Sequence, residues 1–545
     1  MQDLVSEYTF TFEKVEKNGK VVLLTGQTAL DMIVESGFVN KWARLIESCP
    51  WATAFQSPQF VNSWYKAYAN DAFPIVVIQM DGSKLKGILT MAILTSKKSE
   101  DLLRRKNVKI MGAGGFDAEY QTWVTSEDGG NEFALHAIRQ IKAAFPKGNL
   151  MFRFIPADAP MDWLEQSEWR KKSVLQPHKR PLLRYDNPNS KKAFKINKQY
   201  KTKLNRLKRV GKVSFEKVES LERFKEVLDD LAVQYDFRQG VMFNKNQFKD
   251  YPARKDFMLD MFNQGVLHVT LLKLDEHIIG SMGAVFGKDW VHLQGFNTHS
   301  PFYAKHSPGI LHFLHLGNHL AEEGFEVFDL TPGGDKYKEK MATSHDTVYS
   351  LILTDNFVFR MKRLLKKQLH AYWEKKGLRP MSVEMNFIKK AYLLSHRFDL
   401  LKKDKLNFFK KNTSPAVQSS QVKLADPIND IKKNQIKDLL CFEELGTQYS
   451  RWEYLQTAMS KLEEGQELFT WCENGMLLAS IWIMDSNEKH AKGYPDGYTL
   501  KDVYLHPDIK TQFPSFLRGC VNHLQGDNPG RNIYLSTANG FEALA

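Results

Sequence analysis

The sequence predicts a mixed α/β fold in which strands and helices build one sheet-based architecture. Three stretches of the chain follow the same order of elements: two strands joined by a tight turn, a third strand, a helix and a final strand. The paired strands alternate apolar and polar residues, or form short apolar runs bounded by turn residues. We therefore expect a mixed (α+β) sheet in each stretch, although only element order, and no sequence identity, relates the three.

The first unit is predicted to span residues 1–186. It opens with a hairpin at 7–26, where EYTFTFEKV alternates, EKNGK turns and VVLLTG returns. The clearest strand pair lies at 74–98, with its turn at Asp81–Gly82. The remaining predicted elements are helices near 40–48, 58–69 and 131–145 and strands at 108–112 and 150–156.

The second unit is predicted to span 187–356. Its strand pair at 265–287 turns at DEH, and the segment SPGILHFLHLGNHLAEEG (307–324) has the apolar spacing of a helix. The remaining predicted elements are helices at 191–209 and 220–237 and strands at 212–218, 289–298, 325–331 and 348–356.

Residues 357–425 are expected to be a basic helical segment ending in a flexible tether, NTSPAVQSSQ (412–421). A third unit is predicted at 426–545, and its element order makes it a shorter version of the first two. Its elements are a strand pair at 468–486, strands at 499–507 and 532–537, and a helix at 513–526.

The composition indicates a globular protein of several domains. The 545 residues exceed what one core can hold, and 43% of them are hydrophobic against 26% charged. The first residues lack the apolar core of a signal peptide, and no apolar run reaches the length of a membrane helix. The four cysteines form no CxxC pair, so neither a zinc site nor a disulfide framework is indicated. We expect a cytoplasmic location and no bound metal.

The net charge of +13 is clustered in two segments, 191–212 and 360–376. The first has ten basic residues and no acid. It could be a solvated helix face, or an anion-binding patch in which Lys203 and Arg206 contact substrate. The second sets aromatic and aliphatic residues against Lys and Arg, so it could pack on the second unit or lie on the anionic inner face of a membrane. Nucleic acid is not expected as a partner, because only charge and no binding motif points to it.

The most informative stretch is 292–341. Within it, Ser307-Pro308-Gly309 opens a helix, with Ser307 as a candidate N-cap and Pro308 at the first helical position. Free amides at a helix N-terminus attract phosphate, and Gly309 would let a phosphate approach the backbone. The same tripeptide also caps ordinary helices.

The chain resembles GNAT-superfamily acyltransferases related to the cellulose-biosynthesis protein CelD and, more distantly, the FemAB peptidoglycan transferases. The resemblance covers about residues 40–356. The matching segments are Gln56–Phe60, Arg206–Phe215, Ser307–Gly309, Phe328-Asp329, Gly333 and Tyr337-Lys338. The loop Tyr303–His306 departs from the usual GNAT pyrophosphate signature, which is richer in glycine.

The resemblance implies tandem GNAT-like units, of which the second binds acyl-CoA, acetyl-CoA in the first instance. The donor would lie with its pyrophosphate at the 307–309 helix start, and backbone near Leu293–Asn297 would stabilise the developing oxyanion. Implied cofactor-binding residues are Ser307, Gly309, Ile310, Leu311, Gly295 and Phe296. Implied catalytic residues are Lys338, Asp329 and Tyr337, with Gly333 joining Lys203 and Arg206 in substrate binding.

Lys338 follows a strand that faces the cleft and is the candidate for charge stabilisation, although a solvated surface lysine is the alternative. His292, His306 and Asp329 are the candidate general bases. His312, His315 and His319 have metal-like spacing on one helix, but no carboxylate partner is evident, so a structural role is expected.

The function expected is transfer of an acyl group from CoA to an amine or hydroxyl of a sugar, envelope or polysaccharide precursor. Two alternatives stay open. One is a non-catalytic GNAT-like scaffold of a polysaccharide or envelope assembly, and the other is a FemAB-like transferase that uses aminoacyl-tRNA. The sequence does not define the oligomeric state.

Overall fold

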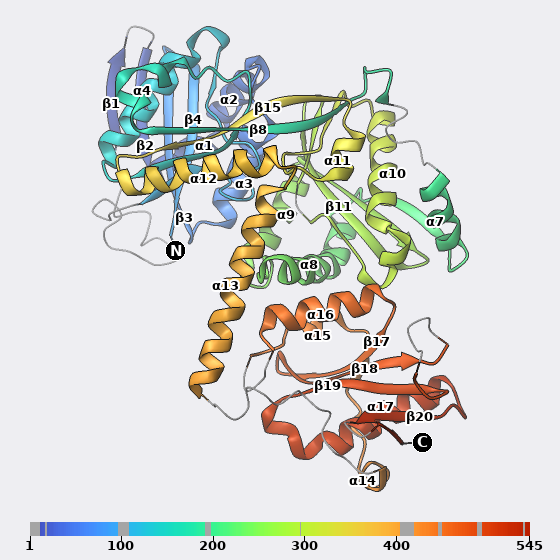
Figure 1. Cartoon of the computed structure of the whole chain (residues 1–545). Helices are drawn as coiled ribbons and strands as arrows, with labels where there is room; N and C mark the ends of the chain where they lie inside the picture. Colours follow the sequence, from blue (N-terminus) through green and yellow to red (C-terminus); the bar gives the residue numbers. More distant parts are fainter. Residues whose placement is uncertain are drawn as a thin grey trace.

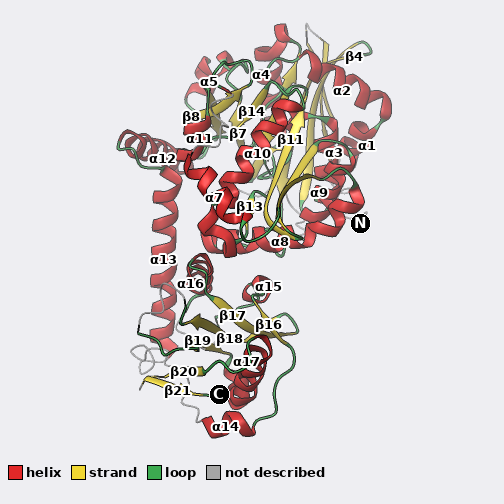
Figure 2. Ribbon diagram, turned by 90° about the vertical axis from the view of Figure 1, so that its right-hand side faces the viewer, coloured by secondary structure: helices red, strands yellow, loops and turns green. Residues whose placement is uncertain are grey.

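The computed structural model describes residues 11–16, 19–95, 108–190, 198–294, 296–403, 419–444, 449–487, 493–537 and 540–544. Two sheet-containing bodies lie one above the other, and helix α13 (Pro380–Lys403) runs beside the lower one (Figures 1 and 2). The larger body contains the first two units, which share one sheet, and the smaller is the C-terminal unit. Both sheets contain antiparallel and parallel neighbours, so the predicted mixed α/β class is confirmed.

The first unit forms the hairpin, strand pair and helices predicted from its sequence. The structure adds helix α1, which begins at Gly26, the last residue of the predicted hairpin. The elements are β1 (Thr11–Glu16), β2 (Gly19–Thr25), α1 (Gly26–Val34), α2 (Ser36–Ser48), α3 (Pro58–Ala67), β3 (Ala72–Asp81), β4 (Lys84–Leu94), β5 (Lys109–Gly112), β6 (Val124–Thr125), α4 (Gly130–Ala144) and β7 (Asn149–Ile155).

The second unit also follows the predicted order, with two unpredicted helices, α9 and α11, and a helix α8 that extends to Phe243. Its elements are α7 (Lys198–Lys208), β9 (Val213–Lys217), α8 (Leu221–Phe243), α9 (Ala253–Asn263), β10 (Leu267–Leu274), β11 (His277–Gly287), β12 (Trp290–Leu293), β13 (Thr298–His299), α10 (Pro308–Glu322), β14 (Val327–Asp329), α11 (Lys336–Met341) and β15 (Ser344–Leu353).

A long strand that the sequence did not reveal joins the two units. β8 (Ser173–Arg184) pairs with β15 from Ser173 to Leu182, and its last residues pair with β14, while β15 also pairs with β7. The strand contains Pro177 and Pro181, which cannot donate to a sheet ladder and so argued against a strand. Both prolines lie before Leu182, where the β14 ladder begins, so neither has to donate an N–H to β14; the carbonyl of Pro181 still accepts from the amide of Leu330. The sheet is therefore continuous across the two units that were predicted to meet at residues 186 and 187, because β15 of the second unit lies between β7 and β8 of the first.

The central strands of the second unit diverge beside the start of α10. β12 and β14 are parallel and pair only as far as His292 and Asp329. Beyond that point Gln294 donates its amide to Gly283 of β11, whereas Leu330 donates to Pro181 of β8. The segments that follow β12 and β14 thus bond to different neighbouring strands, and a space opens between these two segments.

Apolar residues spaced three or four apart from Ala193 to Val210 predict a buried stripe on the basic helix, and α7 confirms the middle of that stripe. Leu207 is buried, and Tyr200 and Leu204 pack against the core. Val210, however, is 58% exposed, because the helix ends at Lys208 and the next residues turn away. Ala193 and Ile196 lie outside the described residues.

The C-terminal unit repeats the order of the second, with β19 and β20 parallel as β12 and β14 are. It packs on α8, where Trp452 Nε1 donates to the carbonyl of Val241 at 2.8 Å. The elements are α14 (Ser419–Leu424), β16 (Ile431–Lys433), α16 (Arg451–Glu463), β17 (Glu467–Glu473), β18 (Met476–Asp485), β19 (Tyr498–Leu505), α17 (Phe513–Asp527), β20 (Ile533–Thr537) and β21 (Gly540–Ala543).

The segment between the second and third units is helical, as expected for 357–403. Helix α12 (Phe357–Lys375) lies against β8, and α13 continues from it toward the C-terminal unit. Most of the predicted tether, residues 412–418, lies outside the described residues, and Ser419–Gln421 begin α14. No helix in the described part of the chain combines the length and the apolar character needed to cross a membrane.

Candidate functional site

A cavity of about 580 Å³ occupies the space where β12 and β14 diverge. The N-terminus of α10 forms one wall, α8 another, and the segment that leads into α11 a third. Residues from all three units reach it, since Glu119 comes from the first and Glu463 from the C-terminal unit. Side chains or backbone that line it include Glu119, Arg238, Asn297, His299, Gly309 and Lys338.

Ser307 precedes α10 but does not cap it with its side chain. Its backbone is left-handed (φ 54°, ψ 52°), whereas a capping side chain requires extended backbone. The hydroxyl instead accepts a hydrogen bond from Lys203 Nζ at 2.5 Å. The carbonyl of Ser307 accepts from the amides of Ile310 and Leu311, both at 3.1 Å. Ser307 therefore occupies the predicted N-cap position, but the capping by its side chain that this position implies is not found.

Of the backbone amides of Gly309, Ile310 and Leu311, which are the ones expected to bind the donor phosphate, only that of Gly309 has no partner among the described residues. Pro308 has no N–H, and the amides of Ile310 and Leu311 already close the first turn, which leaves Gly309. Gly309 and Ile310 line the cavity, whereas the Leu311 side chain is buried in the core. A Cβ at position 309 would approach His299 Nδ1 to 3.2 Å, so glycine keeps this corner open.

Positive charge gathers around this helix start. Lys203 of α7 touches Ser307, and Arg238 of α8 lines the cavity and donates to the carbonyl of Asn297 at 2.7 Å. Burial lowers the pKa of His306, and the nearby charges of Lys305, Arg206 and Lys203 lower it further. Arg206 itself is exposed. These charges add to the positive end of the helix dipole, so the corner favours an anion.

Lys338 faces the same cavity from α11. Only 7% of the residue is exposed, which excludes the solvated-lysine alternative. Its Nζ donates to Thr331 Oγ1 at 2.9 Å and lies 3.8 Å from Asp335 Oδ2. Burial lowers the pKa of Lys338, and the carboxylates of Asp335, Glu119 and Asp329 oppose that shift. The arrangement is a buried ammonium held at a cavity wall.

Two further residues of this wall were singled out from the sequence. Tyr337 lines the cavity and packs edge-on against Phe313, and burial raises the pKa of its phenol to about 12. It is therefore a neutral hydrogen-bond donor at pH 7. Gly333 lies in the turn before α11, with φ 152°, but does not line the cavity; its neighbour Asp335 does.

Asp329, which the resemblance implied to be catalytic, points away from this cavity. It is fully buried, accepts from His292 Nδ1 at 2.8 Å and from the amide of Thr331 at 2.8 Å, and lies 3.6 Å from Arg180 Nη1. Burial alone would raise its pKa, but the hydrogen bond from His292 and the charge of Arg180 lower it overall. Asp329 is thus a fixed anion within a closed network.

His292 and Arg180 instead line a second cavity, of about 730 Å³, beside the first unit. Phe296, another donor-site candidate, is buried in the core, where it packs near Phe224. Gly295 lies outside the described residues. The backbone expected at the donor is represented in the first cavity by Leu293, Gln294 and Asn297.

Sequence reasoning missed four residues that the fold brings to the cavity: Glu119, Arg238, His299 and Glu463. Burial, followed by the charge of Arg238, lowers the pKa of His299 to about 4, so its imidazole is neutral at pH 7. Burial raises the pKa of Glu463. Arg238 lies one residue beyond the predicted end of its helix, and the other three come from segments whose proximity only the packing of the units reveals.

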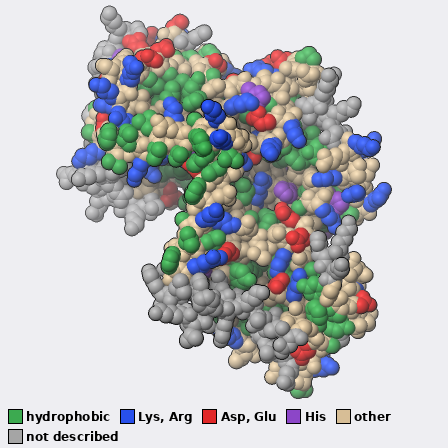
Figure 3. Space-filling model, viewed as in Figure 1, with side chains coloured by type: hydrophobic (Ala, Val, Ile, Leu, Met, Phe, Trp, Pro, Cys, Tyr) green, Lys and Arg blue, Asp and Glu red, His purple; other side chains and the backbone are tan. Residues whose placement is uncertain are grey.

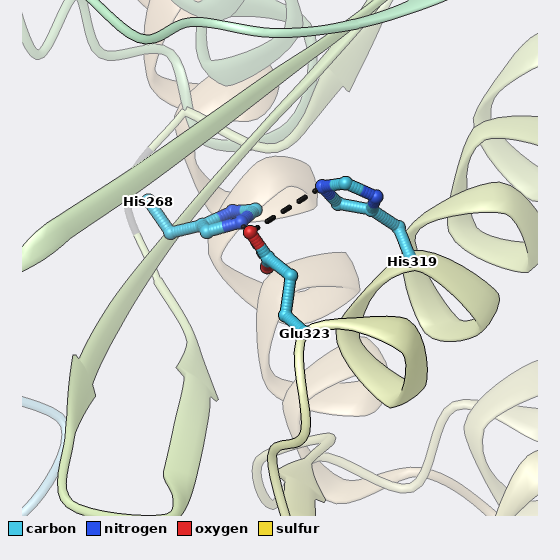
Figure 4. A group of neighbouring side chains, drawn as sticks. All are labelled: His268, His319 and Glu323. Atoms are coloured by element: carbon cyan, nitrogen blue, oxygen red, sulfur yellow. Dashed lines mark hydrogen bonds and ion pairs between the residues drawn. The ribbon is translucent and has the colours of Figure 1, made fainter.

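A histidine and glutamate cluster lies on the far end of α10. His268 of β10, His319 and Glu323 converge with their ligand atoms within 4.8 Å of one another (Figure 4). His268 Nε2 lies 2.9 Å and His319 Nε2 3.5 Å from the Glu323 carboxylate, which Lys217 also contacts. A metal ion would have to compete with that ammonium. Of the other two spaced histidines, His312 bonds to Thr270 and His315 stacks on Phe215.

Residues 195–339 match the family described as the acetyltransferase (GNAT) domain. This stretch contains α7, α10, β14 and the Lys338 wall of the cavity. No curated protein matches the chain. The match supports a GNAT-type acyltransferase fold for this part of the chain, and such domains in general take acyl-CoA as a co-substrate.

Several solved structures are similar in fold. The C-terminal domain of a putative lysylphosphatidylglycerol synthetase from Agrobacterium fabrum is 12% identical, with a TM-score of 0.39 over 61% of this chain and 95% of that one. FemX is 10% identical, with a TM-score of 0.42 over 60% and 98%. A tandem GNAT protein from the clavulanic acid biosynthesis pathway is 12% identical, with a TM-score of 0.35 over 61% and 98%.

Proposed function

We propose that this protein transfers an acyl group, acetyl in the first instance, from acyl-CoA to an amine or hydroxyl of a sugar or envelope precursor. The observation that carries the proposal is that the unpaired amide of Gly309 and the buried ammonium of Lys338 line one cavity. A helix N-terminus binds phosphate, and a preorganised cation stabilises charge that develops on a carbonyl oxygen. The helix N-terminus suits the pyrophosphate of a CoA thioester, and the ammonium suits the carbonyl oxygen of its acyl group.

The donor would bind with its pyrophosphate at Gly309, where Lys203 and Arg238 supply positive charge. The cavity then leads from this corner to the wall formed by Tyr337 and Lys338. The acceptor would enter beside Glu119 and Glu463, the acidic residues of the first and third units. On this proposal all three units shape the site.

The acceptor nitrogen or oxygen attacks the thioester carbonyl carbon, the carbon–sulfur bond breaks, and the CoA thiolate takes up a proton. Lys338 would stabilise the negative charge on the carbonyl oxygen in the tetrahedral intermediate. Among the described residues that line the cavity, the neutral imidazole of His299 can accept the proton that the acceptor loses after attack, and its low pKa makes it a weak base. Asp329 has no part in this scheme, because its oxygens are committed to the buried network.

Titration of the full chain with acetyl-CoA tests the proposal directly. We expect saturable binding that weakens with salt, followed by release of free thiol when an amino-sugar acceptor is added. Failure to bind any acyl-CoA would contradict it. Transfer from aminoacyl-tRNA would then support the FemAB-like alternative, and the absence of both activities would favour the scaffold.

A further inference from the structure

Helix α12 exposes its apolar side to solvent. Six large apolar side chains lie along one side of the helix and are between 41% and 64% exposed, and no residue of the helix is buried. We name them the apolar ridge: Phe357, Val358, Met361, Leu365, Leu369 and Tyr372. A surface helix of a globular protein ordinarily turns such a stripe toward the core. The ridge is therefore unpartnered among the residues that the structure describes.

The side of α12 that faces the protein combines polar residues with the partly buried Phe359, Leu364 and Trp373. His370 lies 3.1 Å from Gln176 of β8 through Nδ1 and 2.9 Å from Glu384 of α13 through Nε2. Lys366 forms an ion pair with Glu384 at 2.8 Å. These contacts fix the rotation of α12 about its own axis. The polar network therefore holds the apolar ridge on the outward side of the helix.

The start of α13 extends the same surface. Phe387 and Ile388 are 68% and 54% exposed. Between residues 357 and 390 the chain carries ten Lys or Arg and only two acids, Glu374 and Glu384. In the space-filling view, hydrophobic and basic side chains alternate along the region of α12 and α13 (Figure 3).

We infer that α12 and the first turns of α13 dock this protein on an anionic phospholipid bilayer, with the apolar ridge inserted among the lipid headgroups. A helix with an apolar stripe flanked by Lys and Arg binds at such an interface through buried area and attraction to anionic lipid. A nucleic acid could bind the Lys and Arg side chains, but it would gain nothing from the exposed Phe, Leu and Met side chains. This inference does not depend on the proposed acyl transfer.

The docking surface is connected to the candidate site. Arg379, between α12 and α13, pairs with Asp335 at 2.6 Å, and Asp335 lines the cavity beside Lys338. Docking would thus hold the cavity close to the membrane, within reach of a lipid-linked acceptor.

Vesicle flotation with the full chain tests the inference. We expect binding to phosphatidylglycerol–phosphatidylcholine vesicles, weaker binding at high salt, and little binding to phosphatidylcholine alone. Replacing Met361, Leu365 and Leu369 by Ser should weaken binding at least tenfold. The matched control replaces Val34 and Leu424, also exposed and apolar but outside the ridge, and should bind like the parent.

A second pair of variants separates charge from apolar contact. Lys362→Glu with Lys375→Glu should weaken binding, whereas the exposed pair Lys41→Glu with Lys171→Glu should not. Equal binding to neutral vesicles, or no effect of the ridge substitutions, would overturn the inference. A parent that is dimeric without lipid and becomes monomeric when the ridge is replaced would also overturn it, because the ridge would then be a protein interface.

Discussion

Lys338 Nζ donates to the hydroxyl of Thr331 at 2.9 Å, and Thr331 itself has a left-handed backbone, with φ 61°. A β-branched residue rarely adopts this conformation, which costs on the order of 1–3 kcal/mol. The amide of Thr331 is held by Asp329 Oδ1 at 2.8 Å, so the buried anion on one side of β14 fixes the turn that positions the ammonium on the other. Such strain is typical of a residue that orients a functional group.

Replacing Lys338 by Met should separate chemistry from binding. If Lys338 stabilises the transition state, kcat should fall about 100-fold while acetyl-CoA affinity changes little. The protein should also become no less stable at pH 7, since the variant removes a buried charge. A full-rate variant would contradict the assignment, and steady-state kinetics together with a binding titration distinguish the cases.

The pKa of Lys338 gives that stability effect a pH dependence. Its pKa is lowered on folding, so the folded state loses the lysine proton first and the unfolded state holds more protons in the window just below the ordinary value of about 10.4. Stability should therefore rise with pH across that window in the parent relative to Lys338→Met. Urea unfolding at several alkaline pH values measures the difference, and parallel curves for the two proteins would contradict the shift.

Gly309→Val should obstruct the donor phosphate. The new Cβ would lie 3.2 Å from His299 Nδ1, and the branched side chain would fill the corner where the free amide points. We expect acetyl-CoA affinity to fall at least tenfold. Gly526→Val is the matched control, because Gly526 is also helical, in α17, and a Cβ there meets nothing within 4 Å. Equal loss in both variants would indicate a general effect of valine on folding.

Lys203→Glu should weaken the binding of acetyl-CoA in a salt-dependent way, because the Nζ of Lys203 lies beside the helix start at Ser307. The effect should be largest at low ionic strength and shrink as salt screens the charges. Lys225→Glu, an exposed substitution on α8, is the control. An unchanged affinity at low salt would leave α7 as a solvated basic face, and the triple change at Lys203, Arg206 and Lys208 would then add nothing.

Local pattern was enough to predict most strands and helices, and the start of α10 at Pro308. What it could not give were features that depend on distant segments. The strand β8 is not predictable from its sequence, because whether a proline needs to donate to a neighbour depends on which strands lie beside it. The left-handed backbone of Ser307 is not encoded in the tripeptide either. Arg238 and His299 join Gly309 only after α8 packs across the sheet, and β14 turns Asp329 away from the cavity that Lys338 faces.

Asp329→Asn tests whether this residue acts on stability and not on chemistry. The carboxylate accepts from His292 in a fully buried site and lies near Arg180, which keeps its own pair with Asp346, so the variant loses mainly the charge-assisted hydrogen bond from His292. We expect the free energy of unfolding at pH 7 to fall by about 2 kcal/mol. The pKa of Asp329 is lowered on folding, so its contribution is present above the unfolded value of about 3.9 and is lost as pH falls through the folded value. The parent and Asp329→Asn should therefore converge in stability in strong acid, which urea unfolding from pH 7 down to pH 2 would measure. At a temperature where the variant is folded, its kcat should stay within a few-fold of the parent. A loss of kcat as large as that of Lys338→Met, without a loss of stability, would instead return Asp329 to the catalytic role that the resemblance implied.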